Sequence, residues 1–146
     1  MKVLFVCHGN VNRSAAAEII AKQDYPELEV KSCGLKTTNG KITAKKMRDV
    51  LTEQGYKTEG IRSTVITQEL VDWADQIFYM DDANEKRFVE QFGPLEKAEK
   101  LSNQIAGVKK IPDPAFAEGN TMHLEVINLI KLAMSKWMAS EKWITG

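Results

Sequence analysis

The chain opens on an apolar segment that runs directly into a loop and then a helix, Val3-Leu4-Phe5-Val6-Cys7-His8-Gly9-Asn10-Val11-Asn12-Arg13-Ser14. Its four consecutive apolar residues, 3–6, favour a buried strand, and the Gly-Asn pair ends that strand. Residues 14–21 are strong helix formers, with Ser14 in place to cap the helix. Cys7 therefore lies where a strand ends and a helix is about to begin.

A thiol at this position lies close to the N-terminus of a helix. The unpaired backbone N–H groups and the helix dipole stabilise negative charge there, so we expect Cys7 to be partly ionised near neutral pH. The same N–H groups form a cradle for a tetrahedral oxyanion, and the planar guanidinium of Arg13 can hold two of its oxygens. The loop therefore combines a nucleophile with an anion site.

The segment from Cys7 to Ser14 resembles the phosphate-binding loop of the low-molecular-weight protein tyrosine phosphatases, which also follows the first strand of the fold. The resemblance implies a phosphatase that hydrolyses phosphomonoesters, with protein phosphotyrosine or a small aryl phosphate as substrate and inorganic phosphate as product. Cys7 would form a phosphocysteine, and Arg13 would clamp the phosphoryl group. The expected substrate-binding residues are His8, Gly9, Asn10, Val11, Asn12, Arg13 and Ser14.

A second motif, Pro112-Asp113-Pro114, lies late in the chain. Its prolines fix the backbone around one acid, and family members carry an Asp-Pro pair in a late loop that faces the nucleophile. The resemblance thus implies that Asp113 is the general acid. Ser14 is expected to donate a hydrogen bond to the Cys7 thiolate, and Asn10 to hold the loop. By resemblance, Ser32 also supports the loop.

The chain departs from the family at two places. Asn12 stands where members usually have a second cysteine, so we expect Cys7 to be over-oxidised more readily unless Cys33 can reach it. The stretches that carry the aromatic walls of the pocket are 35–38 and 115–116 here, and they contain one aromatic residue, Phe116. We therefore expect a weaker or broader ester preference than that of a dedicated tyrosine phosphatase.

Length and composition bound the remaining possibilities. A chain of 146 residues that is 43% hydrophobic predicts one domain, 1–146, that needs neither a disulfide nor a metal. Twenty basic and 20 acidic residues give a net charge of +0, which argues against binding to nucleic acid or to a membrane surface. No apolar stretch approaches the roughly 18 residues of a membrane span, so we expect a cytoplasmic protein, either a monomer or a weak homodimer.

The cysteines and histidines do not indicate a cofactor. A reducing compartment favours a free Cys7 over a disulfide between Cys7 and Cys33. His8 and His123 form no pair with metal-ligand spacing, so neither a metal nor another cofactor is expected.

Alternating patterns predict the fold class. Strands are expected at 28–33 and 76–80, with a weak last strand that ends at Ile111, and helices at 42–55, 69–74, 82–92 and 120–139. The pattern predicts an α/β three-layer sandwich with a central four-stranded parallel sheet and an N-terminal phosphate-binding loop. Because ligands collect beyond the C-terminal ends of parallel strands, the Cys7 and Asp113 loops should meet at that edge.

Two alternatives remain at this level. An arsenate reductase on the same scaffold also needs an oxyanion loop and a cysteine nucleophile, but it requires resolving thiols, and Cys33 is the one further cysteine. A phosphate- or phosphopeptide-binding module without turnover would result if the Asp113 loop were misplaced.

Overall fold

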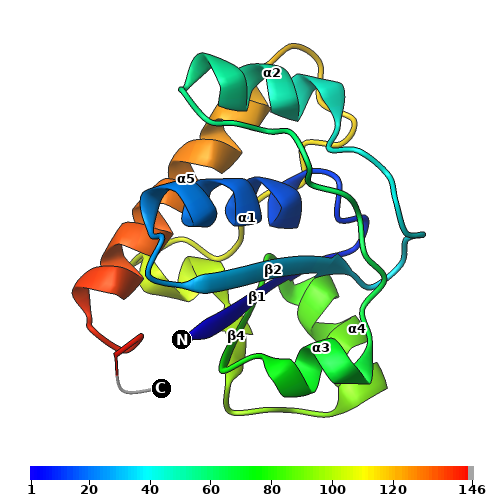
Figure 1. Ribbon diagram of the computed structural model, residues 1–146, viewed down its shortest axis with the longest axis vertical. Helices are drawn as coiled ribbons and strands as arrows, with labels where there is room; N and C mark the ends of the chain where they lie inside the picture. The colour runs from blue at the N-terminus through cyan, green and yellow to red at the C-terminus, as the bar shows by residue number, and fades with distance from the viewer. Residues whose placement is uncertain (145–146) are drawn as a thin grey trace.

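The computed structural model describes residues 1–144, and strands alternate with helices along most of its length (Figure 1). In chain order the elements are β1 (Lys2–Cys7), α1 (Arg13–Asp24), β2 (Glu29–Gly34), α2 (Lys45–Glu53), α3 (Gln68–Trp73), β3 (Gln76–Tyr79), α4 (Asp82–Phe92), β4 (Ala98–Lys100), the short 3₁₀ helix η1 (Leu101–Gln104) and α5 (Thr121–Ala139). No helix within this part of the chain is long and apolar enough to cross a membrane.

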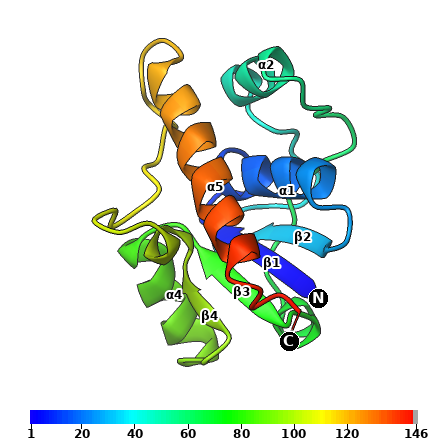
Figure 2. The ribbon, with the colours of Figure 1, turned by 90° about the vertical axis from the view of Figure 1, so that its left-hand side faces the viewer.

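The four strands form one parallel sheet in the order β2-β1-β3-β4. Helices α1 and α5 cover one face, with α2 beyond α1 on the same side, and α3 and α4 cover the other face (Figures 1 and 2). The predicted three-layer sandwich with a four-stranded parallel sheet is therefore confirmed. Cys7 pairs in register with Gly34, so β1 and β2 end together at the edge of the sheet where the first loop begins.

The sheet is buried on both faces because its central strands are almost entirely apolar. Phe5, Phe78 and Trp137 are fully buried on the face covered by α1 and α5. The rings of Phe5 and Phe78 stack with centroids 5.9 Å apart, and Phe78 meets Trp137 edge-on at 5.3 Å. Leu4 and Phe88 pack together on the opposite face. These two layers hold β1 rigidly, and with it the position of Cys7.

The prediction of the last strand is wrong. The fourth strand is β4, not a strand that ends at Ile111, and Ile111 lies in the long connection to α5. Strand β4 has only three half-buried residues, Ala-Glu-Lys, so no apolar alternation marks it in the sequence. The helix expected at 42–55 is shorter for a related reason, since Ile42 is used in an isolated bridge to Arg62 and α2 begins later.

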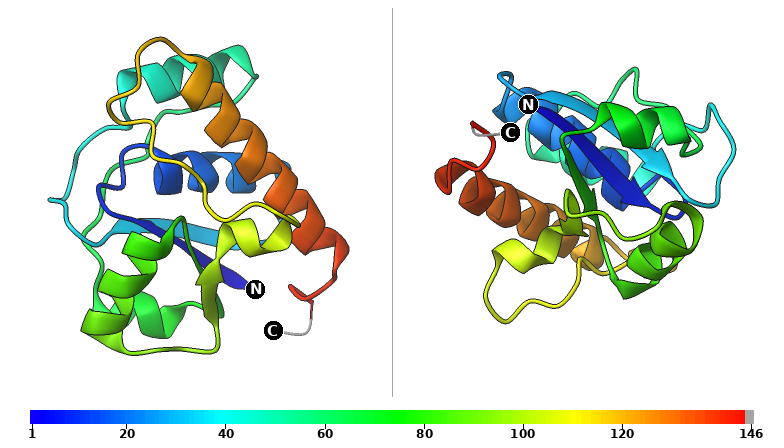
Figure 3. Two further views of the ribbon diagram at one scale, coloured as in Figure 1. Left: turned by 180° about the vertical axis from the view of Figure 1, so that it is seen from behind. Right: turned by 90° about the horizontal axis from the view of Figure 1, so that it is seen from below.

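The Asp113 loop therefore does not follow a strand, yet it reaches the expected edge of the sheet. The backbone N–H of Ile111 donates to the carbonyl of Met80, just beyond β3, at 2.8 Å. Figure 3 shows this connection passing beside the loop after β1 on its way to α5. The meeting of the two loops was predicted correctly, although the reason given for it was wrong.

Candidate active site

The Cys7 side chain lies at the carboxyl end of β1, where it is 3% exposed. Its sulfur is 2.9 Å from the hydroxyl of Ser14, and it accepts a hydrogen bond from the backbone N–H of Asn10 at 3.3 Å. Both contacts come from the loop and the first turn of α1. They place two polar groups, the Ser14 hydroxyl and the Asn10 backbone N–H, within hydrogen-bonding distance of the sulfur.

Asn10 organises the loop through its side-chain amide. Its φ of 56° lies in the left-handed region, which is costly for a residue other than glycine and requires support. The amide nitrogen donates to the hydroxyls of Ser14 at 2.8 Å and Ser32 at 2.9 Å, and the amide oxygen accepts from the backbone N–H of Thr64 at 2.8 Å. Because Ser14 accepts from Asn10, its own proton is free to point at Cys7.

Ser14 does not cap the helix, contrary to expectation. Helix α1 begins at Arg13 with Asn12 before it, and no side chain caps it. Ser14 therefore lies within the first turn, where its hydroxyl faces Cys7. Ser32 lies one step further from the sulfur and donates to the buried carboxylate of Glu18 at 2.5 Å. Ser14 and Ser32 both lie behind the loop and support it, and neither lines the cavity in front of Cys7.

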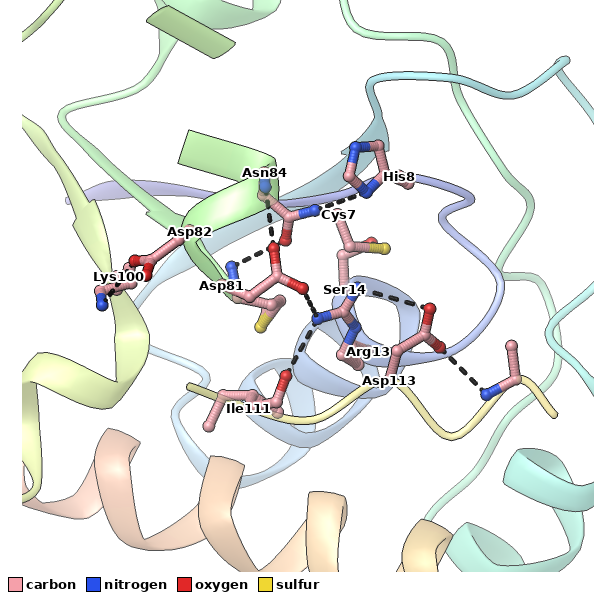
Figure 4. A network of polar contacts seen from close by, with 12 residues as sticks. Cys7, His8, Arg13, Ser14, Asp81, Asp82, Asn84, Lys100, Ile111 and Asp113 are labelled. Atoms are coloured by element: carbon pink, nitrogen blue, oxygen red, sulfur yellow. Dashed lines mark hydrogen bonds and ion pairs between the residues drawn. The ribbon is translucent and has the colours of Figure 1, made fainter. Parts of the chain in front are cut away.

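The Arg13 guanidinium is buried and held from three sides (Figure 4). One terminal nitrogen, Nη1, donates to Asp81 Oδ2 at 2.7 Å and to the carbonyl of Ile111 at 2.9 Å. The other, Nη2, lies 3.7 Å from Asp113 Oδ2. Burial alone would raise the pKa of Asp81, but hydrogen bonds from Arg13 and the Asn84 backbone and the Arg13 charge outweigh it and lower that pKa.

Asp113 faces the loop from the opposite wall. Its carboxyl group is about half exposed, and Oδ1 accepts from the backbone N–H of Ala115 at 3.0 Å, which fixes its direction. A cavity of about 70 Å³ separates this wall from Cys7. The lining residues are Cys7, His8, Gly9, Asn10, Val11, Asn12, Arg13, Asp113 and Ala115.

The backbone of the loop supplies the donors for an anion in this cavity. Within residues 1–144, the N–H groups of Gly9, Val11 and Asn12 donate no hydrogen bond. Grouped N–H donors and a fixed guanidinium match the oxygens of a tetrahedral oxyanion. A thiol can attack from one end of such a ligand while a carboxyl group protonates the leaving atom at the other. Cysteine-dependent phosphoryl transfer is the chemistry this arrangement supports, and the class of protein that it defines is a phosphatase.

His8 lies beside the cavity and is held in one tautomer. Asn84 is fully buried, and its amide oxygen accepts from the Met80 N–H at 3.1 Å, so its amide nitrogen must donate to His8 Nδ1 at 2.9 Å. The ring proton therefore sits on Nε2. Burial lowers the pKa of His8, Asp81 opposes that shift and Arg13 reinforces it. The lowered pKa and the hydrogen bond that Nδ1 accepts both favour the neutral ring.

Cys33 cannot reach Cys7. Cys33 pairs in register with Val6, and neighbouring side chains of a strand point to opposite faces, so Cys33 lies in the layer with α3 and α4. Cys7 lies in the other layer, and both thiols are free. Burial raises the pKa of Cys33, which leaves it a neutral thiol.

Three supporting residues were missed in the sequence. Asp81 caps helix α4, with Oδ1 accepting from the N–H of Asn84 at 2.8 Å, and its second oxygen accepts from Arg13. Asn84 and Glu18 carry no local signal because their partners are distant in the chain. Of these three residues, only Asp81 has a sequence signal, that of a carboxylate able to cap a helix directly after a central strand.

Comparisons with known proteins agree with this class. The family model described as "Low molecular weight phosphotyrosine protein phosphatase" matches residues 2–143. The chain belongs to this family, and it is a phosphatase. A low molecular weight protein-tyrosine-phosphatase of Acinetobacter johnsonii is 29% identical over 135 residues, covering 92% of this chain and 94% of the relative.

Two further relatives show the range of named activities. A protein-arginine-phosphatase of Geobacillus stearothermophilus is 34% identical over 116 residues, covering 77% of this chain and 78% of the relative. The solved structure of a protein tyrosine phosphatase from Entamoeba histolytica superposes with a TM-score of 0.86 at 26% identity, covering 100% of this chain and 99% of that chain.

Proposed function

We propose that this phosphatase removes phosphoryl groups from phosphorylated proteins, with phosphotyrosine as the first candidate, through a phosphocysteine on Cys7. The observation that carries the proposal is the alignment of three groups around one small cavity: the Cys7 sulfur, the buried Arg13 guanidinium and the Asp113 carboxyl group. Each has the role that phosphoryl transfer requires, namely nucleophile, charge stabiliser and proton donor.

The reaction proceeds in two displacements. The Cys7 thiolate attacks phosphorus and forms a P–S bond while the P–O bond to the substrate breaks and Asp113 protonates the departing oxygen. Asp113, now a carboxylate, then removes a proton from a water molecule that attacks the phosphocysteine. Inorganic phosphate leaves, and Cys7 departs as a thiolate that the Ser14 hydroxyl stabilises. Arg13 and the loop N–H groups hold the equatorial oxygens in both steps.

Hydrolysis of p-nitrophenyl phosphate tests this mechanism. Cys7→Ser should abolish turnover, and Asp113→Asn should reduce kcat about 100-fold or more, the usual range for loss of a general acid. Cys33→Ala is the matched control, because this thiol lies across the sheet, and it should retain wild-type kcat. Phosphate binding without turnover in the wild type would instead support the binding-module alternative.

Phosphoarginine is a second candidate substrate, and two observations favour it. The relative at 34% identity is named a protein-arginine-phosphatase. The cavity wall beyond the loop consists of Asp113 and Ala115, whereas Phe116 is fully exposed and does not line it, so a phenyl ring finds little to stack on. Asp113 can protonate a leaving nitrogen as well as a leaving oxygen.

Rates on matched phosphotyrosine, phosphoserine and phosphoarginine peptides decide between the candidates. We expect phosphotyrosine to be preferred over phosphoserine only weakly, because the aromatic wall is absent. A kcat/KM for phosphoarginine above that for phosphotyrosine would make phosphoarginine the substrate class. The arsenate reductase alternative has no support from the geometry, since Cys33 is in the wrong layer to resolve an adduct on Cys7.

A further inference from the structure

A second cleft, distinct from the cavity at Cys7, lies along the outer edge of the sheet. It has a volume of about 380 Å³, and we call it the β2-edge cleft. Strand β2, helices α1 and α3, and the segment from Gly60 to Thr64 contribute its walls. Its lining residues are Glu18, Lys31, Ser32, Gly60, Ile61, Arg62, Thr64 and Leu70.

The floor of the β2-edge cleft is made of residues that hold the catalytic loop. Ser32 accepts a hydrogen bond from the Asn10 side chain at 2.9 Å, and the backbone N–H of Thr64 donates to the same side chain at 2.8 Å. Glu18 fixes the hydroxyl of Ser32 in turn. Asn10 needs this support because its φ is positive, and its own N–H contacts the Cys7 sulfur. Asn10 therefore contacts residues of the cleft through its side chain and the Cys7 sulfur through its backbone N–H.

The charges at the rim indicate which ligand the cleft would take. Neither Lys31 nor Arg62 makes an ion pair within residues 1–144. The Lys31 ammonium lies 4.5 Å above the ring of Trp73, and the one hydrogen bond of the Arg62 guanidinium goes to the neighbouring carbonyl at 3.4 Å. Both cations are exposed and lack acidic partners.

Glu18 does not cancel this positive charge. Its carboxylate is 8% exposed and already bound by Lys22 Nζ at 2.5 Å as well as by Ser32. The charge of Lys22 therefore balances the charge of the Glu18 carboxylate. Two cations without acidic partners, in a cleft that Thr64 also lines, match the charge of an anion with several acceptor oxygens.

We propose that the β2-edge cleft binds a small oxyanion, a phosphate or a carboxylate, and that this binding activates the phosphatase. An anion that bridges Lys31 and Arg62 draws the segment 60–64 toward β2. The hydrogen bond from the Thr64 N–H to the Asn10 side chain then varies less in length. Asn10 is then held more firmly in its left-handed conformation, and the N–H that contacts Cys7 is better placed. The activation, though not the binding itself, rests on the proposed function of Cys7.

Malonate is the first probe, because its two carboxylates can span two cations. Competition at the Cys7 loop raises only KM for p-nitrophenyl phosphate, whereas occupation of the β2-edge cleft changes kcat at saturating substrate. We expect malonate to raise kcat about twofold or more, the scale of coupling through a hydrogen-bonded network. The double variant Lys31→Ala/Arg62→Ala should keep the basal kcat and lose the response.

Lys57→Ala is the matched control, since this exposed lysine belongs to the neighbouring surface and does not line the β2-edge cleft. It should respond to malonate as the wild type does. A response that survives in the double variant, or a kcat that malonate leaves unchanged in the wild type, would overturn the activation.

Amide NMR shifts give a readout that does not depend on turnover. Malonate and inorganic phosphate are titrated separately, and saturable shifts at 60–64 with either one support the site and identify its ligand as carboxylate or phosphate. The shifts should be lost in Lys31→Ala/Arg62→Ala. Shifts confined to the loop 8–13 with both probes would contradict the site. A protein that shows the shifts at 60–64 but no hydrolysis would refute the proposed function and leave the binding site standing.

Discussion

At the scale of single residues, the active site depends on side chains that never touch substrate. Arg13 is directed by Asp81, and the two groups are separated by 68 positions in the chain. Burying a guanidinium without a carboxylate beside it would cost free energy of folding. Asp81 therefore balances the charge of Arg13 and also orients its guanidinium. The sequence predicts catalytic roles for Cys7, Arg13 and Asp113 but does not predict this partner, because nothing in the local pattern marks a contact over that distance.

Asp81→Asn should therefore lower kcat/KM for p-nitrophenyl phosphate about 10- to 100-fold, the cost of one buried charge-assisted hydrogen bond. The neighbouring Asp82 supplies the control, since its side chain is 87% exposed and pairs with Lys100. Asp82→Asn should change kcat/KM less than about twofold. Equal losses in both variants would show that α4 as a whole matters and that the Arg13 contact does not.

Oxidation of Cys7 is the second consequence at this scale. Asn12 lines the same cavity as Cys7, and its amide oxygen is buried without a hydrogen-bond partner among residues 1–144. No thiol on this face of the sheet can trap an oxidised Cys7, since Cys33 belongs to the other layer. Cys33 therefore does not protect Cys7 from over-oxidation.

Peroxide should inactivate the wild type in a way that a reductant does not reverse, because the sulfenic acid of Cys7 proceeds to the sulfinic acid. In Asn12→Cys, dithiothreitol should restore most of the activity, and mass spectrometry should show a disulfide between positions 7 and 12. Cys33→Ala should behave as the wild type does. Full recovery of the wild type together with a Cys7–Cys33 disulfide would reject this account.

At the scale of elements, the close approach of β2 to the first loop sets the shape of the site. The backbone N–H groups of Leu35 and Lys36 donate to the carbonyls of Cys7 and His8, each at 2.9 Å.

Strands β1, β2 and β3 could be predicted because apolar runs mark buried strands. Strand β4 could not, because three half-buried residues of mixed character carry no periodic signal. The loop therefore emerges from the part of the sheet that the sequence describes best.

Gly34 is the residue that permits this approach. A Cβ at this position would lie 2.7 Å from the His8 carbonyl oxygen and 3.1 Å from Asn10 Cβ, and the carbonyl belongs to backbone that cannot swing away. Gly34→Ala should lower the free energy of unfolding by about 1–3 kcal/mol in urea denaturation, the usual cost of overpacking.

Gly9→Ala is the matched control for stability, because its added Cβ would meet Val11 at an ordinary 3.7 Å. Its free energy of unfolding should stay within about 1 kcal/mol of the wild type. If Gly34→Ala changed the free energy of unfolding as little as Gly9→Ala, β2 would have room to shift away from the loop. The close contact between Gly34 and the loop would then not constrain the structure.

At the scale of the whole molecule, the fold follows from alternation and handedness more than from any single contact. The chain order of strands and helices, together with the right-handed crossover rule, was enough to predict a parallel sheet with helices on both faces. Parallel strands all end at one edge of the sheet, and on that ground the sequence predicts that the Cys7 and Asp113 loops meet, although the Asp113 loop follows no strand. The path of residues 101–120 was not predictable, since η1 and the long connection to α5 depend on tertiary packing.

Helix α5 closes one layer over the sheet, and Trp137 is the side chain through which it does so. Trp137 is fully buried against Phe78, whereas Leu132 on the same helix is 43% exposed. Trp137→Ala should cost about 3–5 kcal/mol of unfolding free energy, because it leaves a large cavity between helix and sheet. Leu132→Ala should cost less than about 1 kcal/mol, although it removes an apolar side chain from the same helix.

A third variant separates ring packing from polarity. Trp137 Nε1 has no hydrogen-bond partner within residues 1–144, so Trp137→Phe removes a buried, unpaired N–H while it keeps an aromatic ring. We expect it to cost about 1–2 kcal/mol, well below the alanine variant, because the gain from losing the N–H offsets part of the lost volume. Urea denaturation of the three variants measures the order directly. If Trp137→Phe proved as damaging as Trp137→Ala, the indole nitrogen would have to be paired in solution, and the closure of α5 would depend on a polar contact as well as on apolar packing.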